Sequence, residues 1–523
     1  MNLLTNPASA LGASIARTAA TYDALPYETK PYPRTSPARL AAIAKLFGLE
    51  PPPPMQRARV LELGSGAGGN LIPHAARCPE GQFVGVDLAA TQVADGQARI
   101  ARAGLANVRL YQASITELPD DLGTFDYIIC HGVYSWVPAE VRSALLAACR
   151  RLLNPTGVVI VSYNVYPGWR MFEPMRDAFR LMIPEDIPPR QRVAMARELM
   201  GFLGKLAPNN TPYAQVLRDA PERLNSSPDD YIFHEYMEVT NEPCTFSDFL
   251  NAAAEHDLAY LAESDLETMF PEKVSPEAAL FLRERTNNDL VSLEQLLDAL
   301  TGRAFRQTLL VAGERFGQIR RNLSSESMVE LNFLGFMGMR VERESGAVSI
   351  SDGSGHTMRS TAPGIAIALE RLVAQFPASI SFEEAAQGLS STDRAALADA
   401  LYQMVLAAMI DIVDMPVAAV RASARPKATD LVRSDAAAGM ALTANLRHEL
   451  VKVDPIAMAL LPALDGKTGR RDLERHLVTQ AEQGRVQLAT DGSALTGSRL
   501  RQHVADRLPQ ILDGIGGAGL LET

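Results

Sequence analysis

The stretch Val60-Leu-Glu-Leu-Gly-Ser-Gly-Ala-Gly-Gly-Asn70 decides the expected fold. Its first four residues predict a short buried strand, and the glycines that follow predict a sharp turn into a helix. Glycine permits positive φ angles and leaves bare backbone for a ligand to approach, and the amides at a helix N-terminus favour a negative group. A turn of this kind after the first strand of an α/β sheet is typical of a nucleotide-type cofactor site.

A second apolar strand, Phe83-Val-Gly-Val-Asp87, ends in a carboxylate about twenty residues further on. Asp87 is placed there to accept hydrogen bonds from ribose hydroxyls. A glycine turn and a terminal aspartate on consecutive strands fit either NAD or S-adenosylmethionine. The alternative interpretation of Asp87 is an exposed strand-end residue that only caps the next helix.

Two details favour S-adenosylmethionine over NAD. Glu62 lies two residues before Gly64, where dinucleotide folds more often carry a small apolar residue, and an acidic residue suits the cofactor's ammonium group. After the strand predicted over 125–130, the loop His131-Gly-Val-Tyr-Ser-Trp-Val-Pro138 is crowded with aromatic and hydrogen-bonding groups. At the carboxyl end of a parallel sheet, such a loop overhangs the ligand crevice. We therefore predict S-adenosylmethionine as the cofactor.

Most of the residues expected to contact the cofactor come after the predicted strands, and one, Tyr27, comes from the N-terminal segment. They are Gly64, Gly66, Asn70, Asp87, Leu88, Gln92, Ser114, Ile115, His131 and Tyr27. Ser114 follows the third strand, where the adenine edge is normally held, although a serine is a weaker acceptor for the adenine amine than a carboxylate. Asn70 as a simple helix cap and Gln92 as a solvated helix residue are the alternatives.

The candidate catalytic residues are His131, Tyr134, His234 and Glu235. Methyl transfer is an in-line displacement, so the protein mainly supplies positioning and exclusion of water. An amine acceptor must first lose a proton, which a neutral histidine or a tyrosine oxygen accepts. The alternatives are a packed histidine for His131 and an aromatic core residue for Tyr134. No metal site is predicted.

Two further segments are expected near the crevice. The stretch from Tyr22 to Pro33 is rich in tyrosine and proline, which predicts an extended flap whose rings attract a sulfonium or a lysine ammonium, with packing against the sheet edge as the alternative. In the stretch 233–243, Glu235, Glu238 and Glu242 share one face if helical. That face is either an acidic lip that attracts a cationic substrate or a solvated surface.

The chain alternates strands and helices up to about residue 165 and is mainly helical afterwards. The pattern predicts strands over 59–63, 82–87, 107–112, 125–130 and 157–163, with helices over 91–103 and 139–153. This order predicts an α/β fold with a doubly wound, Rossmann-like parallel sheet. We also expect helices over 290–312, a linker over 424–438, and the order helix, helix, strand in both 376–414 and 467–522.

The expected division of the chain has four parts. Residues 1–165 form a cofactor-binding methyltransferase domain with an N-terminal flap, 166–325 a helical middle domain, 326–423 a first winged-helix-like module and 424–523 a second. A chain of 523 residues is too long for one core.

Bulk properties exclude several classes. The net charge of −11 argues against general nucleic-acid binding, which needs a basic face. The four cysteines show no metal-ligand spacing and indicate a reduced, cytoplasmic protein. We expect no signal peptide in the N-terminal residues and no membrane insertion, because no apolar run approaches ~20 residues.

These motifs together resemble the bacterial class I methyltransferases with a methyltransferase regulatory domain, among them rickettsial protein lysine methyltransferases that modify an outer-membrane protein. The resemblance rests on 22–33, 61–70, 131–138, Tyr163-Asn164 with 167–169, and His234-Glu-Tyr236 with 241–243. It implies a cofactor domain, a helical regulatory domain, a winged-helix C-terminal region and a homodimer. It also implies that Tyr27, Tyr134, Tyr163, His234 and Glu235 face the methyl acceptor.

The leading hypothesis is therefore a methyltransferase acting on a protein lysine or on a small amine. The alternatives are a non-catalytic scaffold that retains a methyltransferase-like domain and an NAD-linked oxidoreductase.

Overall fold

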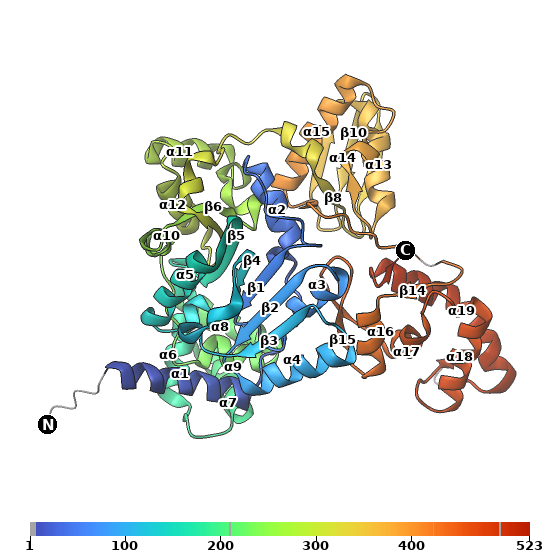
Figure 1. The fold of residues 1–523 in the computed structure, drawn as a ribbon, viewed down its shortest axis with the longest axis horizontal. Coiled ribbons are helices and arrows are strands. Elements are labelled where there is room, and N and C mark those ends of the chain that lie inside the picture. The colour runs from blue at the N-terminus through green and yellow to red at the C-terminus, as the bar shows by residue number, and fades with distance from the viewer. Residues whose placement is uncertain (1–6, 209–210, 422, 491–492, 523) are drawn as a thin grey trace.

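A seven-stranded sheet organises the protein in a computed structural model that describes residues 7–208, 211–421, 423–490 and 493–522 (Figure 1). The strand order, from one edge to the other, is β3 (Val108–Gln112), β2 (Gln82–Asp87), β1 (Arg59–Leu63), β4 (Phe125–Cys130), β5 (Leu153–Asn164), β7 (Phe305–Ala312) and β6 (Leu258–Glu263). The bounds predicted for β1, β2 and β4 are confirmed.

The first five strands are parallel, as predicted. Their central members are short, apolar and buried on both faces, which is typical of a parallel sheet covered by helices. Chain order reverses between β1 and β4, so the loops after these two strands leave the same edge of the sheet side by side. In open α/β sheets a ligand binds at this switch point.

The last two strands differ from the sequence prediction. β7 is antiparallel to both β5 and β6, so the sheet is mixed. Helices were expected over 290–312, but only α12 (Leu290–Thr301) is helical there and 305–312 form β7. The run Leu309-Leu-Val-Ala312 is uniformly buried, and periodicity does not distinguish such a short apolar run from a buried helix.

Helices cover both faces of the sheet (Figure 1). Those that follow or precede its strands are α2 (Pro37–Leu46), α3 (Leu71–Arg77), α4 (Ala90–Arg102), α5 (Ala139–Leu152), α10 (Phe246–Glu255), α11 (Pro276–Thr286) and α12. α10 begins with a capping box formed by Thr245 and Asp248.

The N-terminal segment differs from the expected flap. Tyr22 belongs to a helix, α1 (Pro7–Ala24), and only the residues from 26 to 32 are extended. The alanine-rich sequence of α1 lacks a strong apolar stripe, which is why the pattern did not reveal it. α1 lies against α4, where the Asp23 carboxylate accepts from the backbone N–H of Thr91 at 3.2 Å.

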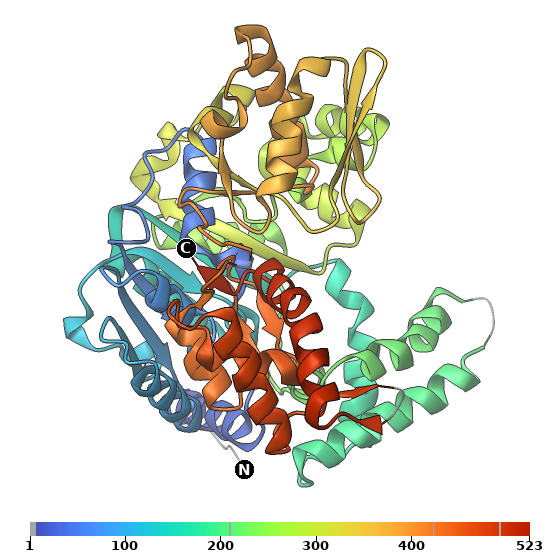
Figure 2. The ribbon, with the colours of Figure 1, turned by 90° about the vertical axis from the view of Figure 1, so that its right-hand side faces the viewer.

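Four helices form the unit between β5 and α10, which agrees with the helical middle region that was predicted. They are α6 (Glu173–Met182), α7 (Pro189–Leu206), α8 (Pro212–Ser226) and α9 (Asp229–Met237). Figure 2 shows α7 and α8 projecting as a pair from the body of the molecule. Their inner faces share one apolar core with α6 and α9.

The C-terminal third contains two further α+β units (Figure 2). The first holds β8 (Asn332–Leu334), β9 (Arg340–Glu344), β10 (Ala347–Ser351), β11 (Thr357–Ser360), α13 (Ala366–Gln375), β12 (Ile380–Ser381), α14 (Phe382–Ala385), α15 (Ser391–Leu406) and β13 (Asp411–Val413). The second holds β14 (Lys427–Ala428), α16 (Asp430–Ala437), β15 (Leu442–Ala444), β16 (Leu450–Lys452), α17 (Pro455–Leu460), α18 (Arg470–Glu482), β17 (Ala489–Thr490), β18 (Ser493–Ala494), α19 (Gly497–Gly517) and β19 (Leu521–Glu522).

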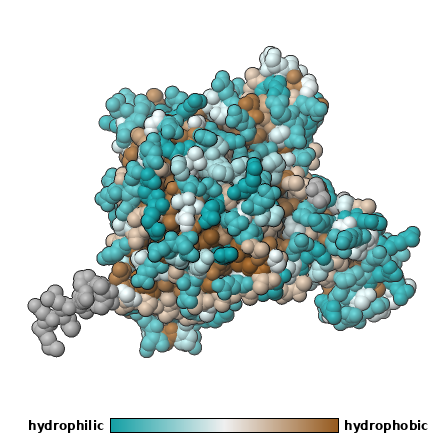
Figure 3. All heavy atoms as spheres, viewed as in Figure 1, coloured by the Kyte–Doolittle hydropathy of each residue, from teal (hydrophilic) through white to brown (hydrophobic). Residues whose placement is uncertain are grey.

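The order helix, helix, strand expected in both units is confirmed, but the linker expected over 424–438 is wrong. These residues form β14 and most of α16, because Leu431, Val432 and Ala436 are buried in the core of the second unit. The face of the molecule seen in Figure 3 is mainly polar, with apolar residues gathered in its lower half. Within the described residues no helix has the length and apolar character needed to cross a membrane.

Candidate active site

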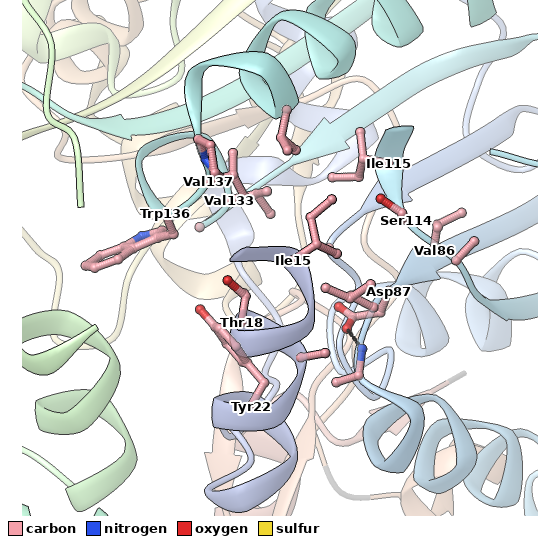
Figure 4. Close-up of a pocket in the computed structure, with 18 residues that line it drawn as sticks. Ile15, Thr18, Tyr22, Val86, Asp87, Ser114, Ile115, Val133, Trp136 and Val137 are labelled. Carbon is pink, nitrogen blue, oxygen red and sulfur yellow. Dashed lines mark hydrogen bonds between the residues drawn. The ribbon is translucent and has the colours of Figure 1, made fainter. Parts of the chain in front are cut away.

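Two adjoining hollows lie beside the glycine turn after β1. The smaller, which we call the apolar pocket, has a volume of about 130 Å³ and is lined mainly by apolar groups from the ends of β2, β3 and β4 and from α1. Figure 4 shows Ile15, Thr18 and Tyr22 on α1 facing Val133, Asp87 and Ile115. The helix α1 therefore forms one wall of this pocket.

The glycine turn permits contacts that any side chain would block. Gly64 has a φ of +80°, and a Cβ there would lie 2.3 Å from Cγ2 of Val133. A Cβ on Gly69 would lie 2.3 Å from the carbonyl oxygen of Thr29, and the Gly69 N–H donates to Oγ1 of Thr29 at 3.1 Å. The turn is therefore closed from outside by the extended N-terminal segment and leaves bare backbone toward the hollows.

Asp87 lines both hollows. Its Oδ2 accepts from the Gly66 N–H at 2.7 Å and its Oδ1 from the Ala89 N–H at 2.9 Å. Burial raises the pKa of this carboxyl, and the two N–H donors oppose that rise. The carboxylate is held rigidly at the end of β2 with lone pairs left for a ligand hydroxyl.

The larger hollow, which we call the polar cavity, has a volume of about 500 Å³. It is built by residues from the N-terminal segment, the glycine turn, the loop after β4, and helices α8 and α9 of the middle unit. The lining residues include Tyr22, Tyr27, Lys30, Tyr32, Glu62, Ser65, Asn70, Gln92, His131, Trp169, Phe172, Arg223, Tyr231, His234, Glu235 and Tyr236.

Four buried polar atoms of this lining have no partner among the residues that the structure describes: Glu62 Oε2, Ser65 Oγ, Gln92 Oε1 and His131 Nδ1. Burial also raises the pKa of Glu62 to about 8. Buried polar groups are normally hydrogen-bonded, so this part of the cavity suits a ligand that carries its own donors and a positive charge.

The predicted cofactor residues divide between the two hollows. Leu88, Ser114 and Ile115 line the apolar pocket, and the hydroxyl of Ser114 caps the turn that follows by accepting from the Thr116 N–H at 3.2 Å. Those in the lining of the polar cavity are Gly66, Asn70, Gln92, His131 and Tyr27, and Gly64 and Asp87 touch both hollows.

Two tyrosines expected at the methyl acceptor lie elsewhere. Tyr134 and Tyr163 are packed in the core with Phe249, and neither lines the apolar pocket or the polar cavity. The Tyr163 hydroxyl is hydrogen-bonded to Oγ1 of Thr308 at 3.1 Å. The core role weighed as an alternative for Tyr134 agrees with this geometry.

The other three candidate catalytic residues line the polar cavity but differ in chemistry. The His131 ring packs on Tyr32 with ring centroids 4.1 Å apart, and burial lowers its pKa to about 4, so the ring is neutral near pH 7. His234 uses both ring nitrogens, since Nδ1 lies 3.0 Å from a Glu238 carboxylate oxygen and Nε2 lies 2.7 Å from the Leu25 carbonyl oxygen. It ties the end of α1 to α9.

Glu235 is the acidic group on the middle unit that faces the polar cavity. Burial raises its pKa to about 7, and Arg176 opposes that rise. The aromatic rings that line the same cavity come from α1, the extended segment, the turn after β5, and α9: Tyr22, Tyr27, Trp169, Phe172, Tyr231 and Tyr236. A carboxylate among aromatic faces suits an organic cation.

Several residues that line the two hollows were not predicted from the sequence. Lys30 lies inside the segment that was recognised for its tyrosines, while Tyr231 and Arg223 precede the stretch 233–243 that was singled out. Ile15 and Thr18 belong to a helix that was not predicted. Lys30 and Tyr231 could have been predicted from their closeness in sequence to motifs that were recognised. Nothing in the sequence pointed to Ile15 and Thr18.

Comparison with known proteins identifies the family. Residues 60–157 match the family described as a methyltransferase domain, 228–312 the predicted methyltransferase regulatory domain, and 424–520 the PKMT C-terminal winged helix domain. Protein RP789 of Rickettsia prowazekii is 31% identical over 495 residues, which covers 91% of this chain and 88% of that protein. The chain belongs to the bacterial S-adenosylmethionine-dependent methyltransferases that carry a regulatory domain.

Solved structures in this methyltransferase family agree over nearly the whole chain. PKMT2 of Rickettsia typhi superposes with a TM-score of 0.84 at 27% identity, covering 95% of this chain and all of that chain. The same protein in complex with AdoHcy superposes with a TM-score of 0.83 at 27% identity, with the same coverage. The Rossmann-like sheet and the winged-helix C-terminal region expected from the sequence are thereby confirmed.

Proposed function

We propose that this methyltransferase N-methylates lysine side chains of proteins. The observation that carries the proposal is the polar cavity, where the Glu235 carboxylate faces an enclosure of aromatic rings. The rings provide flat, apolar walls for the lysine methylenes, and their faces attract the ammonium group. The similarity to PKMT2, a rickettsial protein lysine methyltransferase, supports the same substrate class.

Glu235 is the proposed proton acceptor. A lysine ammonium must lose a proton before its nitrogen attacks, and a base works best with a pKa near the working pH. With a pKa of about 7, Glu235 meets that condition, whereas burial leaves His131 a weak base with a pKa of about 4. His131 is then better suited to hydrogen-bond a ligand through Nδ1, which has no partner among the described residues.

The cofactor, when bound, supplies an electrophilic methyl group on a sulfonium. In our proposal Asp87 holds the ribose hydroxyls, and the apolar pocket with Leu88, Ser114 and Ile115 holds the base. Glu62 pairs with the ammonium of the amino-acid end through Oε2, which has no partner among the described residues, and Gln92 and Ser65 are further hydrogen-bonding groups. Lys30, also in the lining, provides a positive charge for the carboxylate.

A labelling experiment with S-adenosylmethionine identifies the methyl acceptor. The protein is incubated with radiolabelled S-adenosylmethionine and a bacterial cell extract, and labelled polypeptides are digested and analysed by mass spectrometry. We expect methyl-lysine in the wild-type reaction and strongly reduced label with Glu235→Gln. Label confined to small molecules would replace the proposal with a small-amine methyltransferase, and label on another amino acid would contradict it.

The remaining proposals concern organisation. We propose a cytoplasmic protein, supported by four free cysteines, of which Cys78, Cys130 and Cys149 are buried. The four-part division of the chain is retained as a proposal, with the addition that 246–312 contribute to the sheet of the first part. A homodimer stays a prediction that sedimentation velocity would check.

A further inference from the structure

The C-terminal unit reaches the floor of the polar cavity through one side chain. His448 lies in the connection between β15 and β16, and its Nε2 lies 2.7 Å from Oδ1 of Asn70. Asn70 is 378 positions away, directly after the glycine turn. The two side chains are almost completely buried, with 1% and 3% exposure.

Asn70 links His448 to Glu62 through the two ends of its side-chain amide. Its Oδ1 accepts from the Tyr32 N–H at 2.9 Å as well as facing His448, so its amide nitrogen is turned the other way. That nitrogen donates to Oε1 of Glu62 at 2.8 Å and to Oγ1 of Thr35 at 3.0 Å. With Oε1 occupied, the other carboxylate oxygen of Glu62 lies in the lining of the cavity without a partner in the described part of the chain.

The connection that carries His448 is rigid and locally strained. His448 has a φ of +63°, a left-handed conformation that costs energy for a residue other than glycine and persists only where the surroundings enforce it. Hydrogen bonds of Asn445 hold the backbone on both sides of His448. Oδ1 of Asn445 accepts from the N–H groups of Arg447 and Glu449, both at 2.9 Å, and the Asn445 amide donates to the Ala518 carbonyl at 3.0 Å.

The plane of the His448 ring is also fixed by stacking. It stacks on His74 of α3, with ring centroids 3.6 Å apart and planes 15° from parallel. Burial lowers the pKa of His448 well below its usual value, so the ring is neutral. Because Asn70 Oδ1 is an acceptor, the neutral ring carries its proton on Nε2 and donates it to Asn70.

We propose that His448 is a positioning residue of the methyltransferase site, which aims Glu62 at the amino-acid end of the cofactor by fixing the Asn70 amide. The winged-helix unit is then part of the cofactor site rather than only an appended module. The inference rests on the proposed arrangement of the cofactor, in which Glu62 pairs with the ammonium, and it is independent of the methyl acceptor.

Binding measurements on the full chain test the proposal. Calorimetry compares AdoHcy, which carries the amino-acid end, with methylthioadenosine, which lacks it. Loss of one hydrogen bond in the chain to Glu62 should weaken AdoHcy binding to His448→Ala by roughly three- to tenfold. Methylthioadenosine binding should stay within about twofold of wild type, because the contacts of the nucleoside are untouched.

Two further variants keep the test decisive. His448→Gly removes the ring while suiting the positive φ, so it replaces the alanine variant if that one misfolds. Asp435→Asn is the matched control: Asp435 accepts from Arg99 at 3.0 and 2.6 Å across the same interface, but it does not touch Asn70. This control should leave both affinities unchanged.

The outcomes separate the hypotheses. Equal weakening of both ligands in His448→Ala would overturn the proposal in favour of a general structural role, and no weakening of either would overturn it outright. If Glu62→Gln loses the preference for AdoHcy while His448→Ala keeps it, only the role of His448 fails. If Glu62→Gln still prefers AdoHcy to methylthioadenosine, both the proposed role of His448 and the proposed pairing of Glu62 with the cofactor's ammonium fail. The lysine-labelling experiment is unaffected by that outcome.

Discussion

The apolar pocket and the polar cavity share the glycine turn and Asp87, yet they are assembled in different ways. The wall of the apolar pocket comes mostly from the loops after β2, β3 and β4, which lie within one stretch of chain, with α1 added. The polar cavity draws on segments as far apart as Tyr22, Tyr236 and Phe305, and His448 reaches its floor. In our proposal the nucleoside half of the site is thus formed mainly by the loops of the sheet, whereas the acceptor half depends on the other units.

This difference has a chemical counterpart. The apolar pocket is lined mainly by backbone and apolar side chains, and its Asp87 carboxylate is held by two N–H groups. In the polar cavity, the carboxyl groups of Glu62 and Glu235 have raised pKa values. Several polar atoms of its lining also have no partner within the described residues. Groups with strongly shifted pKa values cluster where chemistry occurs, which favours the polar cavity as the place of methyl transfer.

The largest expected effect is that of Glu235→Gln on turnover. Loss of a general base typically lowers the rate by about a hundredfold or more. Because the pKa of Glu235 is raised to about 7, its ionised fraction increases with pH below that value. Wild-type kcat/KM for a lysine peptide should therefore rise up to about pH 7 and show an inflection there. The inflection should be absent in the variant, and an unchanged profile would exclude Glu235 as the proton acceptor.

The second effect concerns the residue that both hollows share. In Asp87→Ala the ribose loses a charged acceptor, which is worth about 1.5–3 kcal/mol, or roughly a tenfold to hundredfold loss of affinity. AdoHcy and methylthioadenosine should weaken equally, since each carries the ribose. Calorimetry with both ligands checks this, and a loss restricted to AdoHcy would place Asp87 on the amino-acid end instead.

These two residues also show what the sequence can reveal. Asp87 was predictable because the end of a strand and a glycine turn are local patterns, and the strands β1, β2 and β4 follow from short apolar runs bounded by turns. Glu235 was named as a candidate catalytic residue, but through the family resemblance and a row of three acidic residues rather than through a local catalytic pattern. Its position among aromatic rings depends on how α9 packs across the crevice, which no local pattern contains.

The parts that escaped prediction share a cause. β7 is an apolar run whose strand character comes from pairing with β5, far away in sequence. His448 carries no motif, and its role comes from a contact with Asn70 between two separate units. Tyr134 shows the opposite error: a tyrosine in a loop beside the ligand crevice looked available, but its ring fills the core against Phe249.

The third effect is a pH dependence of stability that belongs to Glu62. Its pKa in the folded, ligand-free protein is about 8, above the ordinary value of 4.5. The folded state therefore binds more protons than the unfolded state between these values, and stability falls as pH rises from about 4.5 to 8. Glu62→Gln removes this loss, so thermal denaturation at pH 9 should give a higher Tm for the variant than for wild type, with a smaller difference at pH 5.

The same substitution should weaken AdoHcy, which would separate a binding residue from a stabilising one. A variant that is both less stable and weaker in binding would contradict the assignment, because it would show that Glu62 stabilises the ligand-free fold. A buried carboxyl group that lowers the stability of the ligand-free protein when it ionises is expected at a site that binds a positively charged ligand.

The smallest effect tests whether α1 belongs to the apolar pocket in solution. Ile15 is only half-buried and faces the pocket from α1 (Figure 4). Truncation to alanine removes about three methylene-sized groups from partial contact, which should weaken AdoHcy and methylthioadenosine alike by about threefold to fivefold. Arg17→Ala is the matched control, because its side chain is exposed on the same helix and does not line the pocket. If Ile15→Ala binds both ligands as wild type does, α1 is not a wall of the nucleoside site, and that half of the comparison rests on the sheet alone.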